Sequence, residues 1–117
     1  MRDFQKLSIW QKSHSFTLAV YSVTKDFPPD ERYGLTSQMR RSAASIPTNI
    51  AEGCGRDSGP ELKRFLLYAS GFCSELQYQV ILSRDLKFIT NEDFDALSIL
   101  IIEIRKMIFA FIRGLPS

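Results

Sequence analysis

The last quarter of the chain carries the pattern that most restricts the fold. Apolar residues recur there at alternating spacings of three and four, namely Phe94, Leu97, Ile101, Ile104, Ile108 and Phe111. Such spacing places side chains along one face of an α-helix and does not fit the two-residue repeat of a strand. Thr90 precedes the pattern, and its hydroxyl can accept a hydrogen bond from an unpaired amide of the first turn. We therefore expect a helix over residues 91–113.

Three more segments have helical patterning and are separated by turn signals. The interruptions are FPPDE, GCGRDSGP and FITNED, which are rich in proline, glycine and polar residues. The segments between them predict helices over residues 8–26, 31–53 and 60–87. Short connections between long amphipathic helices favour antiparallel neighbours. We predict an all-α fold, an antiparallel up-down-up-down four-helix bundle that forms a single domain over residues 1–117.

Each of these three segments also has one apolar face, which we expect to form the core. The residues are Ile9, Phe16, Val20, Val23 and Phe27, then Leu35, Met39, Ala43, Ile46, Ile50 and Gly53, then Leu62, Phe65, Leu66, Ala69, Phe72, Cys73, Leu76 and Val80. Pro47 lies inside the second segment, where it lacks the N–H that a helix uses. We expect one helix that is kinked, or split near Ala43.

Composition narrows the class of protein. A chain of 117 residues can bury one core, and a net charge of +2 does not by itself indicate a nucleic-acid-binding protein. Cys54, Cys73 and the single histidine, His14, lack the spacing of a disulfide framework or a metal site. The N-terminus does not resemble a signal peptide, and charges interrupt the apolar stretch 97–112. We predict a cytoplasmic protein with no membrane helix, metal or cofactor.

The residues for catalysis are also sparse. The sequence has one histidine, no glycine-rich phosphate loop and no nucleophile next to a base. Glu52 and Glu75 could form a pair of carboxylates, but we expect them to pair with Arg40, Arg41 or a donor on another helix. Cys54 lies near a predicted loop, where its thiol would be exposed without a histidine to activate it. We predict that the protein is not an enzyme.

Two helices have apolar residues outside their core faces. Trp10, His14 and Tyr21 form a second stripe on the first helix, and Ile99, Ile102 and Phe109 lie opposite the core face of the last helix. We interpret these six residues as a candidate oligomer interface. Trp10 and Tyr21 could instead be wide core residues with polar tips, or could stack on nucleic-acid bases.

The second helix also has a polar stripe. Its members are Gln38, Arg41, Ser45, Asn49 and Glu52, at spacings of three or four. Serine and asparagine are poor helix formers, so we expect this stripe to make buried hydrogen bonds to another helix or subunit that support assembly. The alternatives are a solvated face or a role in binding a ligand or nucleic acid.

Several cations could contact nucleic-acid phosphates. The candidates are Lys12, Arg40, Arg41, Arg56, Lys63 and Arg64. An oligomer would repeat this modest patch and strengthen binding through multivalency. The alternative is ordinary surface pairing with Glu52, Asp57 and Glu61.

A longer string of residues resembles a known family. It comprises Trp10-Gln11-Lys12, Phe27-Pro28, Tyr33-Gly34-Leu35, Gln38, Arg40-Arg41 and the run from Ser45 to Gly53, followed by Ala69, Gly71, Glu75 and Leu76. The chain resembles the bacterial four-helix bundle proteins named for 23S rRNA intervening sequences, although Phe72 stands where that family usually has serine. The resemblance implies a homopentamer with no established activity.

Two hypotheses follow for function. In the first, a homo-oligomer binds RNA or DNA through repeated basic patches. In the second, the assembly is a protein-interaction scaffold that binds a protein partner and no nucleic acid. An apolar surface left exposed after assembly would favour the second hypothesis.

Overall fold

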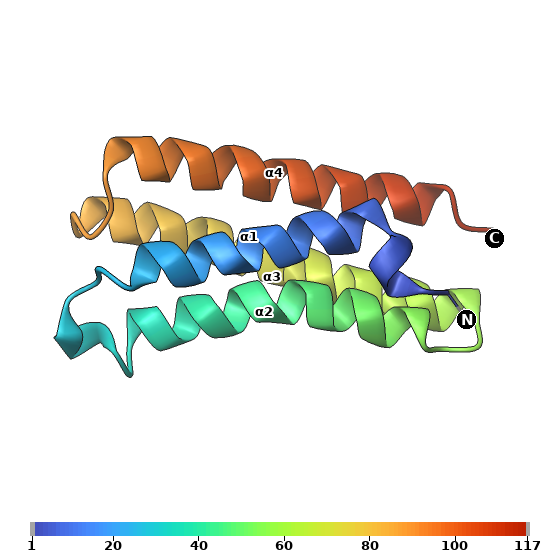
Figure 1. Cartoon of the computed structure of the whole chain (residues 1–117). Helices are drawn as coiled ribbons and strands as arrows, with labels where there is room; N and C mark the ends of the chain where they lie inside the picture. Colours follow the sequence, from blue (N-terminus) through green and yellow to red (C-terminus); the bar gives the residue numbers. More distant parts are fainter. Residues whose placement is uncertain (1, 117) are drawn as a thin grey trace.

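A computed structural model describes residues 2–116 and contains four long helices within that range. They are α1 (Ser8–Thr24), α2 (Leu35–Cys54), α3 (Gly59–Asp85) and α4 (Asn91–Arg113), with short 3-10 helices η1 (Phe4–Lys6) and η2 (Pro29–Glu31). Figure 1 shows consecutive helices running in opposite directions, with both ends of the chain at one end of the bundle. Each long helix packs against two neighbours, because α1 and α3 both contact α2 and α4. The predicted all-α four-helix bundle is confirmed.

The core lies where the apolar patterns predicted it. All six expected core residues of α2 are buried, and so are Leu97, Ile101, Ile104 and Ile108 of α4. The expected core residues that are only half buried are Val23, Phe65, Phe72, Phe94 and Phe111. Gly53 permits close packing of α2 on α3, because a Cβ atom there would lie 3.0 Å from atoms of both Leu62 and Phe65. These contacts fix the register of α2 and α3.

The predicted start of the second helix is wrong by four residues. Residues Pro29–Glu31 form the separate helix η2, and Gly34 has φ −112° and ψ −116°, outside the helical region. The Glu31 carboxylate then accepts a hydrogen bond from the Leu35 amide at 3.0 Å. This acceptor satisfies one of the free amides with which α2 begins.

Pro47 does not split the second helix. Helix α2 continues from Leu35 to Cys54 with Pro47 inside it. Because Pro47 has no N–H, the Ala43 carbonyl loses its usual helical donor. The Thr17 hydroxyl of α1 shares its one hydrogen between the Ala43 oxygen, at 3.0 Å, and the Ser13 oxygen of its own helix, at 2.8 Å. A side chain from the neighbouring helix thus replaces the missing donor.

Helix α3 ends two residues before its predicted end. Lys87 has φ 64°, a left-handed conformation that stops the helix. The Phe88 amide donates to the Ser83 carbonyl at 2.9 Å, and the Lys87 amide donates to the Arg84 carbonyl at 2.9 Å. This pattern is that of a Schellman cap with lysine in the position where glycine is usual.

No helix within residues 2–116 has the length and apolar character needed to cross a bilayer.

Candidate functional site

The α2 polar stripe lies at the surface beside α3. Ser45 donates to the Arg41 carbonyl at 2.7 Å, and Asn49 donates to the Ser45 carbonyl at 2.7 Å, so both bond their own helix. Glu52 pairs with Arg56 one turn later, and Gln38 is exposed. Within residues 2–116, Ser45, Asn49 and Glu52 therefore bond no other helix, whereas Arg41 reaches Glu75 of α3. Hydrogen bonds from the stripe to another subunit, and its role in assembly, stay a prediction.

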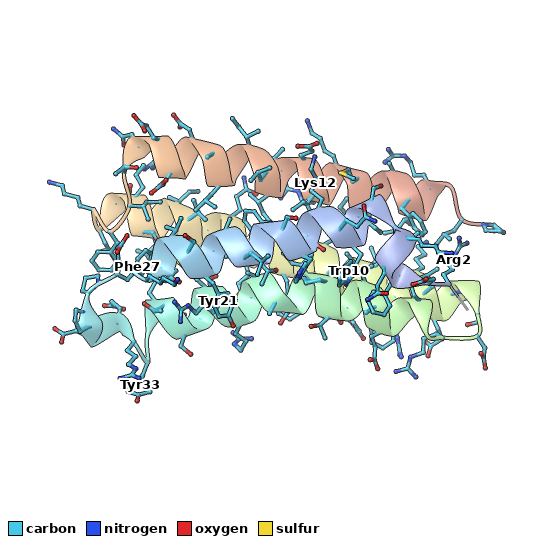
Figure 2. All side chains as sticks on the ribbon, viewed as in Figure 1. Arg2, Trp10, Lys12, Tyr21, Phe27 and Tyr33 are labelled. Carbon is cyan, nitrogen blue, oxygen red and sulfur yellow. The ribbon has the colours of Figure 1, made fainter. Side chains whose placement is uncertain are left out.

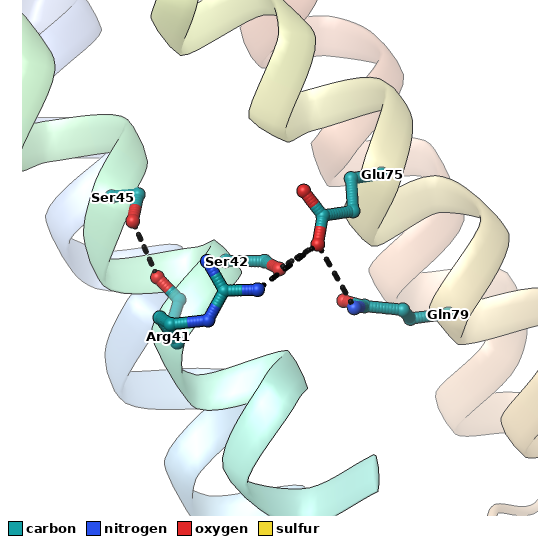
Figure 3. A network of polar contacts seen from close by, with 5 residues as sticks. All are labelled: Arg41, Ser42, Ser45, Glu75 and Gln79. Atoms are coloured by element: carbon teal, nitrogen blue, oxygen red, sulfur yellow. Dashed lines mark hydrogen bonds and ion pairs between the residues drawn. The ribbon is translucent and has the colours of Figure 1, made fainter.

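The polar contact between α2 and α3 is centred on Glu75. One oxygen of its carboxylate accepts from Ser42 at 3.1 Å, from Arg41 at 3.4 Å and from the Gln79 amide at 3.5 Å (Figure 3). The Gln79 carbonyl oxygen is buried and has no partner within residues 2–116. Ser42 and Gln79 were missed in the sequence because each lies beside the core face, where a polar residue resembles an exposed one.

The six candidate cations do not form one surface. Lys12 pairs with Glu103 of α4, and Arg41 pairs with Glu75 of α3. Figure 2 shows Lys12 on the side of α1 toward α4 and Trp10 and Tyr21 toward α2. Surface pairing, the alternative interpretation, therefore accounts for part of the set.

Three of the other candidate cations lie where α2 ends and α3 begins. Arg56 and Arg64 pair with Glu52 and Glu61, and both guanidinium groups lie over the Phe65 ring, 4.8 and 5.4 Å from its centroid. Lys63 is exposed on the same end of α3.

Arg40 lies toward the opposite end of the bundle. Its guanidinium group is 4.7 Å from the Tyr21 ring centroid, and its Nε donates to the Thr24 hydroxyl at 2.8 Å. Within residues 2–116, Arg40 has no carboxylate partner. It is a cation held in place by an aromatic ring and a hydroxyl.

A hollow of 690 Å³ lies between α1 and α2. The indole ring of Trp10 and the imidazole ring of His14 form one wall and stack with centroids 5.0 Å apart and planes 9° apart. Phe4 meets Trp10 edge-on at 5.1 Å. The α2 side consists mostly of small residues, which are Ala44, Pro47, Thr48, Ala51 and Gly55. The hollow is an open groove with an aromatic wall on α1 and, on α2, small side chains together with the Glu52–Arg56 ion pair.

The predicted interface residues of α4 are on a different surface from this groove. Ile99 is 66% exposed and Phe109 is 38% exposed, while Ile102 is half buried. The six candidate interface residues therefore divide into three groups: Trp10 and His14 line the groove, Tyr21 lies outside it against Arg40, and the α4 residues lie on the outer face of that helix.

Helix α3 exposes apolar residues that were not identified from the sequence. They are Leu67, Tyr68, Tyr78 and Ile81, with Tyr78 61% exposed. A shallower hollow beside them is lined by Gly71, Phe72 and Asn49. An added Cβ at Gly71 would meet no atom within 4 Å, so this glycine makes no close helix contact within the chain. These residues could not be told from core residues in the sequence, because apolar residues occupy a wide part of the circumference of α3.

The two thiols are buried, and the two candidate carboxylates each pair with an arginine. Cys54 is buried, contrary to the expected exposure near a loop, and burial raises its pKa although Arg2 opposes the shift. Burial raises the pKa of Cys73 to about 12, against the lowering effect of Arg105. Glu75 pairs with Arg41, as expected, whereas Glu52 pairs with Arg56 four residues further along the chain and not with Arg40, Arg41 or another helix. Residues 2–116 contain no cluster of three or more side chains able to hold a metal ion.

Comparisons with known proteins assign the chain to a family. The 23S rRNA-intervening sequence protein family matches residues 5–110 of the chain. The chain belongs to this family. The fold is similar to a crystal structure from Bacteroides thetaiotaomicron, described as a protein with unknown function from the S23 ribosomal protein family. The two are 23% identical with a TM-score of 0.81, and the match covers 91% of this chain and 99% of the other.

The family assignment confirms the resemblance seen in the sequence but supplies no activity. A comparison with curated proteins gives no match. The function of this member of the 23S rRNA-intervening sequence protein family therefore has to be argued from its surfaces.

Proposed function

We propose that the protein is a non-enzymatic scaffold that associates with copies of itself and binds a protein partner. The observation that carries this proposal is the exposure of apolar residues on three separate surfaces: the α1–α2 groove, the outer face of α4 and the stripe on α3. A single copy of the chain would leave all three in contact with water. Self-association would bury some of this area and leave the rest for a partner.

Assembly into a ring would bury two of these three apolar surfaces on every copy. In a head-to-tail ring each copy uses two different patches, one for each neighbour. The resemblance to the family implies five copies, for which the expected mass is five times 13.4 kDa, or about 67 kDa. The α3 stripe, with Tyr68 and Tyr78, is then the surface offered to a protein partner.

Nucleic-acid binding is the second candidate function. Arg56, Lys63 and Arg64 gather at the α2–α3 end, and a ring would repeat this group in every copy. Lys12 and Arg41 pair with carboxylates of neighbouring helices, and Arg56 and Arg64 pair with Glu52 and Glu61, so Lys63 is the member of the α2–α3 group without an ion pair in the described part of the chain. Binding through the remaining cations would weaken steeply as salt is raised.

Light scattering separates these two functions. The mass of the wild-type protein is measured alone and with a structured RNA at two salt concentrations. We expect a stable multiple of 13.4 kDa whose mass RNA does not change. A salt-sensitive gain in mass that is lost in Lys63→Glu/Arg64→Glu, but retained in the control Lys25→Glu, which reverses an exposed lysine outside the candidate surfaces, would establish the second candidate instead. A monomer at all concentrations would contradict self-association.

A further inference from the structure

We propose that the outer face of α4 in one copy of the chain docks into the α1–α2 groove of the next copy, with Asp95 facing Arg40. This inference rests on the proposed self-association and names the two surfaces that meet. The occupant of the groove is thus a second copy of this chain.

The floor of the groove fits a helix. Ala44, Thr48, Ala51 and Gly55 recur at spacings of four, three and four, so they lie along one line of α2. Small side chains allow another helix to approach within about 8 Å, the short end of the range for helix packing. Arg40 precedes Ala44 by four residues and therefore extends the same line at its N-terminal end.

The outer face of α4 has the matching length. Asp95, Ile99, Ile102, Lys106 and Phe109 recur at spacings of four, three, four and three. The distance from Asp95 to Phe109 is 14 residues and that from Arg40 to Gly55 is 15 residues. At about 1.5 Å per residue, both stripes are a little over 20 Å long. Each stripe can therefore cover the other along its full length.

Charge selects one orientation of this contact. Arg40, Asp95 and Lys106 have no oppositely charged partner within residues 2–116, whereas Lys12, Arg41, Arg56 and Arg64 all do. With α4 parallel to α2, Asp95 lies beside Arg40, and Lys106 lies near Glu52, which already pairs with Arg56. The reverse orientation would place Lys106 toward Arg40, which like charges disfavour.

The aromatic wall then meets the apolar end of the helix. With Asp95 beside Arg40, Phe109 reaches the end of the groove where Trp10 and His14 stack and where Gly55 leaves room. His14 already covers one face of the Trp10 indole ring, so a partner can contact only the other parts of that ring. The contact would unite the α1 and α4 residues that the sequence marked as one interface.

The contact is heterologous, because a groove on one copy receives a helix face of another. Such contacts form a closed ring if the rotation between copies closes, and an open filament if it does not. The groove and the α4 face belong to different helices, so both remain available on every copy until the assembly closes.

A charge swap tests the pairing. We expect Arg40→Asp and Asp95→Arg each to weaken assembly at least ten-fold, measured as the protein concentration at which half the mass is assembled. The double variant Arg40→Asp/Asp95→Arg should recover most of the loss, because the pair is restored with reversed signs. The matched control Arg32→Asp reverses an exposed arginine away from the groove and should leave assembly unchanged.

The outcomes are separable from failure to fold and from failure of the proposed function. Thermal melts show whether each variant folds, and Thr48→Trp, which fills the groove without removing a charge, gives an independent block. Assembly that persists in both single variants and in Thr48→Trp overturns this pairing while leaving self-association intact. Single variants that weaken assembly without rescue in the double variant also overturn it. A wild-type monomer overturns both the pairing and the proposed function.

Discussion

The hydroxyl of Thr17 should stabilise the bundle only because Pro47 is present. Replacing Thr17 with valine keeps the shape of the side chain and removes the donor that lies 3.0 Å from the Ala43 oxygen. Ala43 is fully buried, so its carbonyl would lose this partner out of reach of water. A buried polar group left without a partner costs about 1–3 kcal/mol. We expect Thr17→Val to lower the free energy of unfolding by about 1.5 kcal/mol, which lies in the lower half of that range.

A double-mutant cycle isolates this effect. In Pro47→Ala the amide at position 47 can donate to the Ala43 carbonyl in the usual helical way. In the Pro47→Ala background, Thr17→Val should then lower the free energy of unfolding by less than about 0.5 kcal/mol, because the Ala43 carbonyl keeps a hydrogen-bond donor. The coupling between the two sites should therefore be about 1 kcal/mol.

Urea unfolding followed by circular dichroism, at one fixed protein concentration, measures all four proteins of the cycle. The control is Thr36→Val, because Thr36 is also 8% exposed and its hydroxyl has no hydrogen-bond partner in the described part of the chain. An equal cost of Thr17→Val with proline and with alanine at position 47 would refute the argument that Thr17 replaces the missing donor.

Three further predictions concern single sites. Lys87→Gly should raise the free energy of unfolding by up to about 1 kcal/mol, because Lys87 has φ 64°; a loss measured by urea unfolding would contradict this. Gly53→Ala should lower it by about 1–3 kcal/mol, because a Cβ would lie 3.0 Å from a Phe65 atom, while Gly71→Ala, which meets no atom, should not lower it. Cys73 should react with iodoacetamide at neutral pH only through unfolding, because burial raises its pKa to about 12; a rate equal to that of unfolded protein would be inconsistent with this burial.

The fold could be predicted where one local pattern decides it. The repeat in α4 and the hydroxyl of Thr90 give both bounds of that helix, since the Asp93 amide donates to Thr90 at 3.1 Å. The start of α2 could not be predicted, because the conformation of Gly34 and the hydrogen bond from Leu35 to Glu31 depend on the path of the connecting loop. The end of α3 could not be predicted either. Lys87 has the left-handed conformation that ends the helix, but only a glycine or asparagine at this position would have indicated such a turn from the sequence.

The candidate surfaces could be predicted only in part. Spacing identified the apolar residues of α1 and α4, but it could not show that Trp10 faces a groove floored by small residues of α2. Partners of charged residues also depend on tertiary packing. Lys12 pairs with Glu103, which is 91 residues away along the chain, so sequence distance gave no sign of it. Spacing did identify the polar stripe, but not that Ser45 and Asn49 bond their own helix.

Disulfide trapping measures the proposed head-to-tail contact most directly. Thr48→Cys places a thiol on the groove floor, and Ile102→Cys places one at the middle of the α4 stripe. After oxidation, a mixture of the two single variants should give cross-linked dimers of one variant with the other. The double variant should give a ladder that ends at the number of copies in the ring, which the family resemblance puts at five. Cross-links between two copies of the same single variant, or none at all in an assembled sample, would contradict the docking of α4 into the groove.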